Sequence, residues 1–208
     1  YISNKLNKNY ESRWIFKQHF VNQIGIGSLM THLLSVPDIS AHKLFFSCTS
    51  GQVFYNLFRS NYNDEGLLSN KEAVPFRLSQ SLTRFINPIC MKGRFNAVMT
   101  TMARTLVEPK IKHLLRDLLR LHFRDDLIQW SRVSDRTDIE ANLDNLVEKN
   151  MRTIVDGIEN MVPHQIITIK RDTLASERPI NQKISDLIEA ATSPDNLASM
   201  DPTWNAFV

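Results

Sequence analysis

The chain has 208 residues, 25 of them Lys or Arg and 22 Asp or Glu, so its formal net charge is only +3. With 42% hydrophobic residues it can build an ordinary core, which excludes a wholly disordered, collagen-like or disulfide-stapled chain. One or two domains fit this length. A long stretch without a formal charge, residues 19–37, is too polar for a membrane helix. Two cysteines and no Asn-x-Ser/Thr acceptor favour a reducing compartment, the nucleus or the cytoplasm.

The chain begins at Tyr1 rather than Met, and no basic segment leads into an apolar one near its start. We therefore expect no secretory signal and treat the chain as a piece of a longer protein.

Ser12 is followed by apolar residues at helical spacing as far as Leu34, which predicts a helix of about five turns with a Ser cap. Gly25 and Gly27 lie inside it and indicate close packing of a neighbouring element. A phosphate-binding Gly-rich loop would need a preceding strand and a third glycine, and the sequence has neither here.

Residues 43–47 and 52–56 are short β-prone runs joined by a Gly-containing turn, a pattern that predicts a β-hairpin. Residues 60–73 are rich in Asn, Asp, Ser and Gly, so we expect an exposed loop between two halves of the chain.

Three helices are predicted next, over residues 78–86, 95–106 and 110–130. The third has a charged side in which Arg116, Arg120 and Arg124 alternate with Asp, typical of a solvated, ion-paired face rather than a nucleic-acid interface. Its predicted apolar face consists of Ile111, Leu114, Leu115, Leu118, Leu119 and Leu127.

Thr137 and Glu140 have capping-box spacing and predict a helix that runs to about Val162. An irregular connector over residues 163–178 and an amphipathic helix from Ile180 should follow, with a new short helical turn at residues 193–194. The aromatic side chains near the end favour docking of the tail on protein over insertion into a membrane surface.

Four segments resemble the C-lobe and tail of the phosphatidylinositol 3-kinase-related kinase family. Residues 32–46 (HLLSVPDISAHKLFF) resemble the catalytic loop, and residues 51–59 (GQVFYNLFR) resemble the segment that ends in Asp-Phe-Gly. Residues 74–78 (VPFRL) are similar to the exit of the activation region, and residues 193–204 to the terminal FATC tail. The resemblance implies a mainly α fold with a small β-hairpin, a protein/lipid kinase-like C-lobe followed by a helical FATC tail, and a chain that reaches its natural end.

The resemblance also implies that the catalytic loop is substituted. Asp38 stands where the family has its catalytic-loop Asp, but Ile39 and Ser40 replace the Arg and the His, and Lys43 replaces the metal-binding Asn. Mg²⁺ demands oxygen ligands, whereas an ammonium repels the ion and offers only donors. Asp38 alone is then a loop or helix-cap carboxylate.

The second metal-binding segment shows the same loss. Leu57 stands at the Asp of Asp-Phe-Gly, Phe58 is kept, and Arg59 replaces the Gly. Because phosphoryl transfer needs metal-held phosphates and an acidic residue at the substrate hydroxyl, we expect no catalytic residue, no metal and no cofactor here.

Within the family, the pattern is similar to the pseudokinase scaffold branch of histone acetyltransferase (SAGA-like) coactivator complexes. That resemblance implies a nuclear scaffold whose partners are other complex subunits, with transcription activators bound by the rest of the parent protein. No direct nucleic acid, membrane or small-molecule substrate is expected. The implied division is a C-lobe at 1–130, a connector at 131–175 and a FATC tail at 176–208. The tail residues expected to dock or interact are Leu197, Trp204, Phe207 and Val208.

Two other readings stay open. One is an active phosphatidylinositol 3-kinase-related Ser/Thr protein kinase whose N-lobe lies outside this chain, and Lys43 and Leu57 count against it. The other is an interaction module built on the helix from Ile180 and the aromatic tail. The histidines lack metal-site spacing, and residues 25–28 do not form the Gly-x-Ser-x-Gly elbow of a hydrolase.

Overall fold

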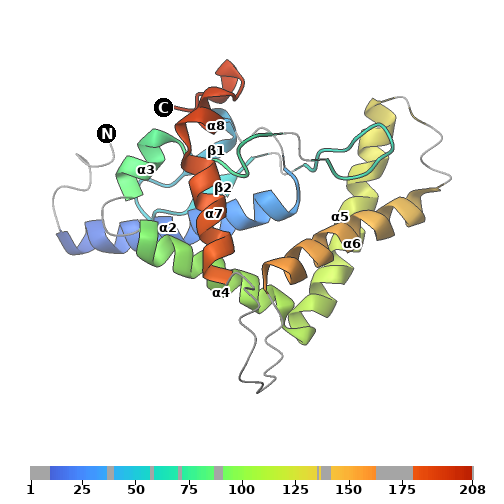
Figure 1. The fold of residues 1–208 in the computed structure, drawn as a ribbon, viewed down its shortest axis with the longest axis horizontal. Helices are drawn as coiled ribbons and strands as arrows, with labels where there is room; N and C mark the ends of the chain where they lie inside the picture. The colour runs from blue at the N-terminus through green and yellow to red at the C-terminus, as the bar shows by residue number, and fades with distance from the viewer. Residues whose placement is uncertain are drawn as a thin grey trace, which may run out of the picture.

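The computed structural model describes residues 10–36, 40–56, 59–69, 72–86, 91–134, 136, 142–162 and 180–207. This part is mainly helical with one two-stranded sheet, which confirms the predicted fold class (Figure 1). None of its helices is long and apolar enough to cross a membrane. The elements are α2 (Tyr10–Leu33), η1 (Ala41–Lys43), β1 (Leu44–Phe46), β2 (Val53–Tyr55), α3 (Gln80–Ile86), η2 (Met91–Phe95), α4 (Asn96–Val107), α5 (Pro109–Val133), α6 (Leu143–Met161), α7 (Ile180–Thr192), α8 (Pro194–Ala198) and η4 (Pro202–Trp204).

Helix α2 packs against α4 and β2 through its two glycines. A Cβ on Gly25 would lie 3.2 Å from Cγ1 of Val98 on α4, and a Cβ on Gly27 would overlap the Tyr55 ring of β2. The prediction of close neighbours at these glycines is confirmed. The prediction of a Ser12 cap is wrong, because Ser12 lies inside a helix that already includes Tyr10.

Four phenylalanines join α2 to the hairpin and α3. The Phe20 ring meets the Phe46 and Phe85 rings edge-on, at centroid distances of 5.7 and 5.3 Å, and stacks with Phe16 at 6.2 Å. Edge-to-face aromatic pairs add about 0.5–1.5 kcal/mol beyond the area that they bury. This cluster therefore fixes the hairpin on the helix that precedes it in the chain.

The predicted hairpin is confirmed. Leu44 pairs with Tyr55 and Phe46 with Val53, antiparallel. Gly51 closes the turn with φ +73°, a left-handed conformation that favours glycine. The side-chain carbonyl of Gln23 on α2 accepts the Val53 N–H at 2.9 Å, which ties the strand to the helix.

Helices α5 and α6 pack together on the right of Figure 1, and both also contact α4. Leu119 and Leu127 are buried there, but Leu114 and Leu118 are each 56% exposed, so the single apolar face predicted for residues 110–130 is wrong. Leu114 and Leu119 differ by about 140° around the helix, and only one of those directions faces α6.

Helix α6 follows the predicted pattern, and its side toward α5 is buried. The predicted capping box at 137–140 and the connector at 163–178 lie outside the described residues. Pro194 opens α8 at its first turn, as predicted.

Candidate functional site

The predicted site residues fall partly inside and partly outside the structure. Those outside the described residues are Asp38, Ile39, Leu57, Phe58 and Val208. Those inside it are Ser40, Lys43, Arg59, Leu197, Trp204 and Phe207.

Lys43 lies at the open end of the hairpin. Its N–H donates to the Ser40 carbonyl at 3.0 Å, and its own carbonyl accepts the Asn56 N–H at 2.8 Å. Asn56 is the neighbour of Leu57 in sequence, but Leu57 itself lies outside the described residues. The structure therefore fixes the backbone of Lys43 against that of Asn56.

Ser40 is buried, with 1% of its surface exposed, and its Oγ lies 3.2 Å from Nε2 of His42. A hydroxyl held by a neighbouring imidazole resembles the first pair of a nucleophile triad. The two residues are separated by one position and sit at the start of η1, where Ser commonly makes local bonds. The pair is therefore explained by the local turn.

Arg59 extends away from the hairpin to α5, where its guanidinium donates to Oε1 of Gln129 at 3.2 Å. Next to it, one oxygen of Asp126 accepts two bonds, from the Ser60 N–H at 3.1 Å and from the Tyr62 hydroxyl at 2.9 Å. Burial and the Asp126 charge raise the pKa of Tyr62 well above its usual range, so Tyr62 stays a protonated donor. Helix α5 thus fixes the chain directly after the hairpin.

Helix α6 holds the next turn of this loop through Asn150, which is completely buried. Its Oδ1 accepts the Leu68 N–H and its Nδ2 donates to the Gly66 carbonyl, both at 2.9 Å. The Arg136 guanidinium bonds the carbonyl and the carboxylate of Asp64. The prediction of an exposed loop is therefore wrong for residues 60–69: the polar residues make the turns, but long-range side chains from α5 and α6 anchor them.

The VPFRL segment (residues 74–78) contacts the tail. Arg77 is 5% exposed, and its guanidinium donates to the backbone carbonyl of Trp204 and, at 3.2 Å, to that of Asn205. The same guanidinium lies over the Trp204 ring at 4.6 Å from the centroid, a cation–π contact. Residues 127 positions apart thus meet in one buried contact.

The other tail residues divide into two groups. Leu197 and Trp204 are 3% and 2% exposed, and Ala206 is also buried. Phe207 is 51% exposed, so its side chain is not enclosed by the described part of the protein. Three anchoring residues, Arg77, Asp126 and Asn150, were not predicted from the sequence. Of these, only Arg77 could have been singled out, because it belongs to the VPFRL segment that is similar to the kinase family.

Comparison with known proteins gives a family model for the tail and relatives for the whole chain. Residues 177–208 match the FATC domain. The chain is 27% identical to "Transcription-associated protein 1" of Drosophila melanogaster and 26% identical to human "Transformation/transcription domain-associated protein" (TRRAP), over 94% and 96% of its length. It is 27% identical over 94% of its length to "SAGA complex/NuA4 acetyltransferase complex subunit Tra1" of Schizosaccharomyces pombe. It spans only 5% of the length of each of these relatives.

Kinases of the same fold are also similar. "Protein kinase rad3" of Schizosaccharomyces pombe is 24% identical over 94% of the chain. The solved structure "FAT and kinase domain of CtTel1" covers 100% of this chain and 15% of that one, with a TM-score of 0.60 at 15% identity, a likeness of fold alone. Over nearly its whole length, this chain is therefore similar to the TRRAP/Tra1 proteins, its residues 177–208 match the FATC domain, and it has the fold of the phosphatidylinositol 3-kinase-related kinases.

Proposed function

We propose that this chain is the catalytically inactive, kinase-like head of a nuclear scaffold subunit of SAGA/NuA4-type acetyltransferase complexes. Its partners would be other subunits of the complex, with activators bound by the rest of the parent protein. In this proposal, residues 1–130 are the C-lobe, 131–175 the connector and 176–208 the tail. The names of the TRRAP/Tra1 relatives support the complex and, through it, the nucleus.

The observation that carries the loss of catalysis is the backbone pairing of Lys43 with Asn56. Leu57 follows Asn56 in sequence, so this pairing supports a single location for the two replacements that the resemblance implies, at the metal-binding Asn and at the Asp-Phe-Gly carboxylate. A kinase at this location needs two or more oxygen ligands for Mg²⁺, because the metal neutralises the charge that develops on the phosphates. Lys43 and Leu57 offer none.

The second candidate is an active Ser/Thr protein kinase, which the likeness to rad3 favours. Calorimetric titration of Mg-ATP into the parent protein, with its N-lobe present, separates the two. A ligand at 100 times its Kd stabilises a protein by about 2.7 kcal/mol, so a nucleotide-binding head should show both heat and a raised melting temperature. The scaffold proposal expects neither, and magnesium-dependent binding would favour the kinase.

Restoring the two metal positions tests how far the site has changed. We predict that Lys43→Asn together with Leu57→Asp does not restore phosphotransfer, because Ile39 and Ser40 still occupy the catalytic-loop positions of Arg and His. Radiolabelled phosphate transfer to a protein substrate would measure this, with each single substitution as the control. Turnover in the double variant would contradict an inactive catalytic loop.

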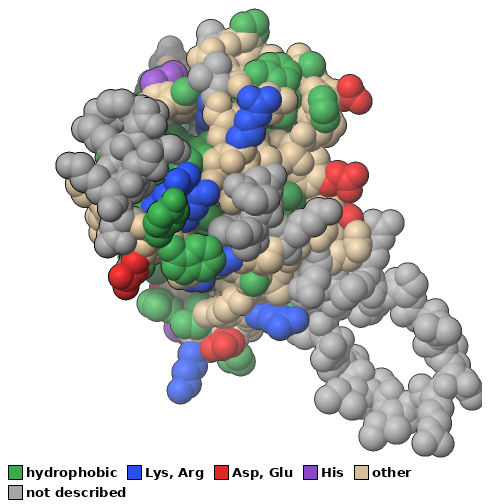
Figure 2. Space-filling model, turned by 90° about the vertical axis from the view of Figure 1, so that its left-hand side faces the viewer, with side chains coloured by type: hydrophobic (Ala, Val, Ile, Leu, Met, Phe, Trp, Pro, Cys, Tyr) green, Lys and Arg blue, Asp and Glu red, His purple; other side chains and the backbone are tan. Residues whose placement is uncertain are grey.

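A direct nucleic-acid partner is not part of this proposal. Nucleic-acid interfaces are strongly basic faces, whereas the face drawn in Figure 2 carries Lys and Arg together with Asp and Glu. On α5, Lys112 pairs with Glu159 and Arg120 with Glu148, both on α6, so part of the positive charge of this helix is compensated. A filter-binding titration with duplex DNA at physiological salt should accordingly show no saturable binding.

A further inference from the structure

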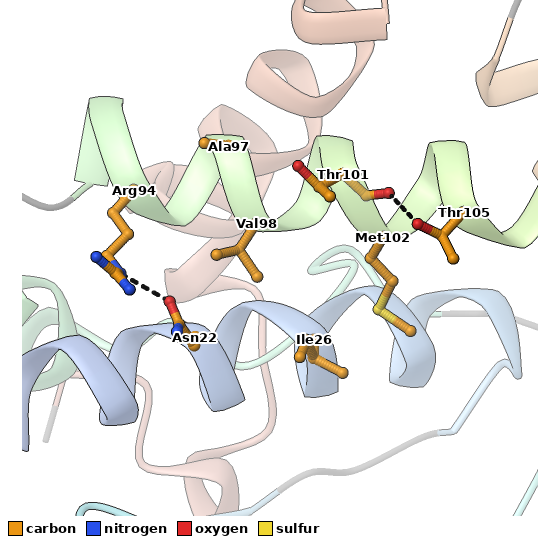
Figure 3. Close-up of a pocket in the computed structure, with 8 residues that line it drawn as sticks. All are labelled: Asn22, Ile26, Arg94, Ala97, Val98, Thr101, Met102 and Thr105. Atoms are coloured by element: carbon orange, nitrogen blue, oxygen red, sulfur yellow. Dashed lines mark hydrogen bonds between the residues drawn. The ribbon is translucent and has the colours of Figure 1, made fainter.

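Helices α2 and α4 line a groove beside their packing contact (Figure 3). Its volume is about 570 Å³. Val98 and Met102 point into it from α4, and Ile26 points into it from α2. Ile26 is 44% exposed. The groove is thus an apolar surface that the described part of the chain leaves in contact with solvent.

One side of the groove is open along its length. Ala97, Thr101 and Thr105 follow one another at intervals of four on α4, line the groove and are exposed. From Arg94 to Thr105 the wall extends over about 16 Å, or three helical turns. Enclosed small-molecule sites bury most of their ligand, whereas a long open trough of small side chains fits a helix laid into it.

Arg94 closes one end and is the charged side chain among the groove-lining residues. Its Nε donates to Oδ1 of Asn22 at 2.7 Å, which holds the guanidinium at the mouth of the groove (Figure 3). Among the residues that the structure describes, its terminal nitrogens have no hydrogen-bond partner. A half-buried guanidinium with free donors pairs best with a carboxylate, because the planar fork matches two carboxylate oxygens.

Neither helix of the groove brings a carboxylate to this guanidinium. Helix α4 contains no Asp or Glu, and the single acidic residue of α2, Glu11, lies eleven positions before Asn22. An occupant with an Asp or Glu at this end of the groove would supply one.

We propose that the α2–α4 groove binds an amphipathic helix of another protein, which places apolar side chains on Ile26 and Met102 and an Asp or Glu on Arg94. This inference is independent of whether the kinase-like head is active. It requires a partner helix of about three turns, with apolar residues at three- and four-residue spacing and the acidic residue at one end.

Site-specific photocrosslinking in the full-length protein, purified with its native partners, identifies the occupant. A photoreactive amino acid at Thr101 should crosslink to one segment of another chain, and mass spectrometry of the crosslinked peptide should show the apolar spacing and the acid. The same amino acid at Arg116, exposed on α5, is the matched control. Crosslinks to a second copy, to lipid or to a segment without an acid would each overturn the proposal, as would no crosslink.

The synthetic form of the crosslinked peptide then tests the charge pair by fluorescence anisotropy. Arg94→Gln should weaken binding by about tenfold or more, and changing the peptide's acid to its amide should cause the same loss without adding to it. Thr101→Arg fills the open trough without touching the Arg94–Asn22 bond, and it should also weaken binding. It is the alternative test if Arg94→Gln alters the fold. Equal affinity in all variants would overturn the proposal.

Discussion

Replacing Arg77 by Met removes every donor from the tail contact while keeping most of the side-chain volume. Each hydrogen bond from a charged group contributes about 1.5–3 kcal/mol, and a buried cation–π contact about 0.5–2 kcal/mol. Two bonds and one stacking contact therefore total about 3.5–8 kcal/mol if the tail stays in place. The tail can instead detach, so that water accepts in place of the lost donors, and this limits the loss of free energy. We therefore expect the free energy of tail docking to weaken by about 2–4 kcal/mol.

Hydrogen exchange followed by mass spectrometry measures this locally. In Arg77→Met, amides of residues 197–207 should exchange faster, while those of α5 and α6 should not change. With Trp14 and Trp130 replaced by Phe, the fluorescence of Trp204 should shift to longer wavelength as its ring enters water. Arg116→Met is the control, because Arg116 is exposed on α5. Unchanged tail protection in Arg77→Met would refute the assigned role of the guanidinium.

Three further substitutions test the packing and the buried imidazole. Gly27→Ala should destabilise the chain by about 1–3 kcal/mol, because the added methyl overlaps the Tyr55 ring. Gly157→Ala should instead stabilise α6 by about 0.8–1 kcal/mol, because its Cβ meets nothing within 4 Å. The midpoints of chemical denaturation compare the two variants. Burial lowers the pKa of His32 below its usual 6.5, so the unfolded chain binds the proton first and the free energy of unfolding falls as the pH drops below 6.5. Urea titrations at pH about 7.5 and about 5.5 measure this decrease in the free energy of unfolding. The decrease should be smaller in His32→Gln and unchanged in the exposed control His113→Gln, and an equal decrease in both variants would contradict the role given to His32.

The helices and the hairpin were predictable because apolar spacing and turn residues are local signals. What periodicity does not contain is the direction from which a neighbour approaches. Leu114 and Leu119 are equally apolar, yet only Leu119 faces α6. When apolar residues cover more than one side of a helix, the position of the partner helix decides which of them are buried and which are exposed.

Part of the candidate site could likewise be predicted from the sequence, and part of it could not. The replacements expected at Lys43 and Leu57 rest on the resemblance to the kinase family, and the pairing of Lys43 with Asn56 follows from the hairpin turn between them. The anchors of the following loop could not be predicted, because Asp126 and Asn150 act across 64 to 84 positions and look like ordinary surface residues of their helices. Phe207 was expected to dock or interact together with Trp204; its side chain is 51% exposed, whereas that of Trp204 is enclosed.

The contact between Arg77 and Trp204 also sets an order of events during synthesis. Helices and the hairpin can form from nearby residues, but this contact must wait until 127 further residues have left the ribosome. Until then, the guanidinium lacks two of the carbonyls that accept its hydrogen bonds. A product interrupted anywhere before Trp204 would therefore lack this contact, and chaperones and proteases could distinguish it from a chain that includes the tail by the exposed segment around Arg77.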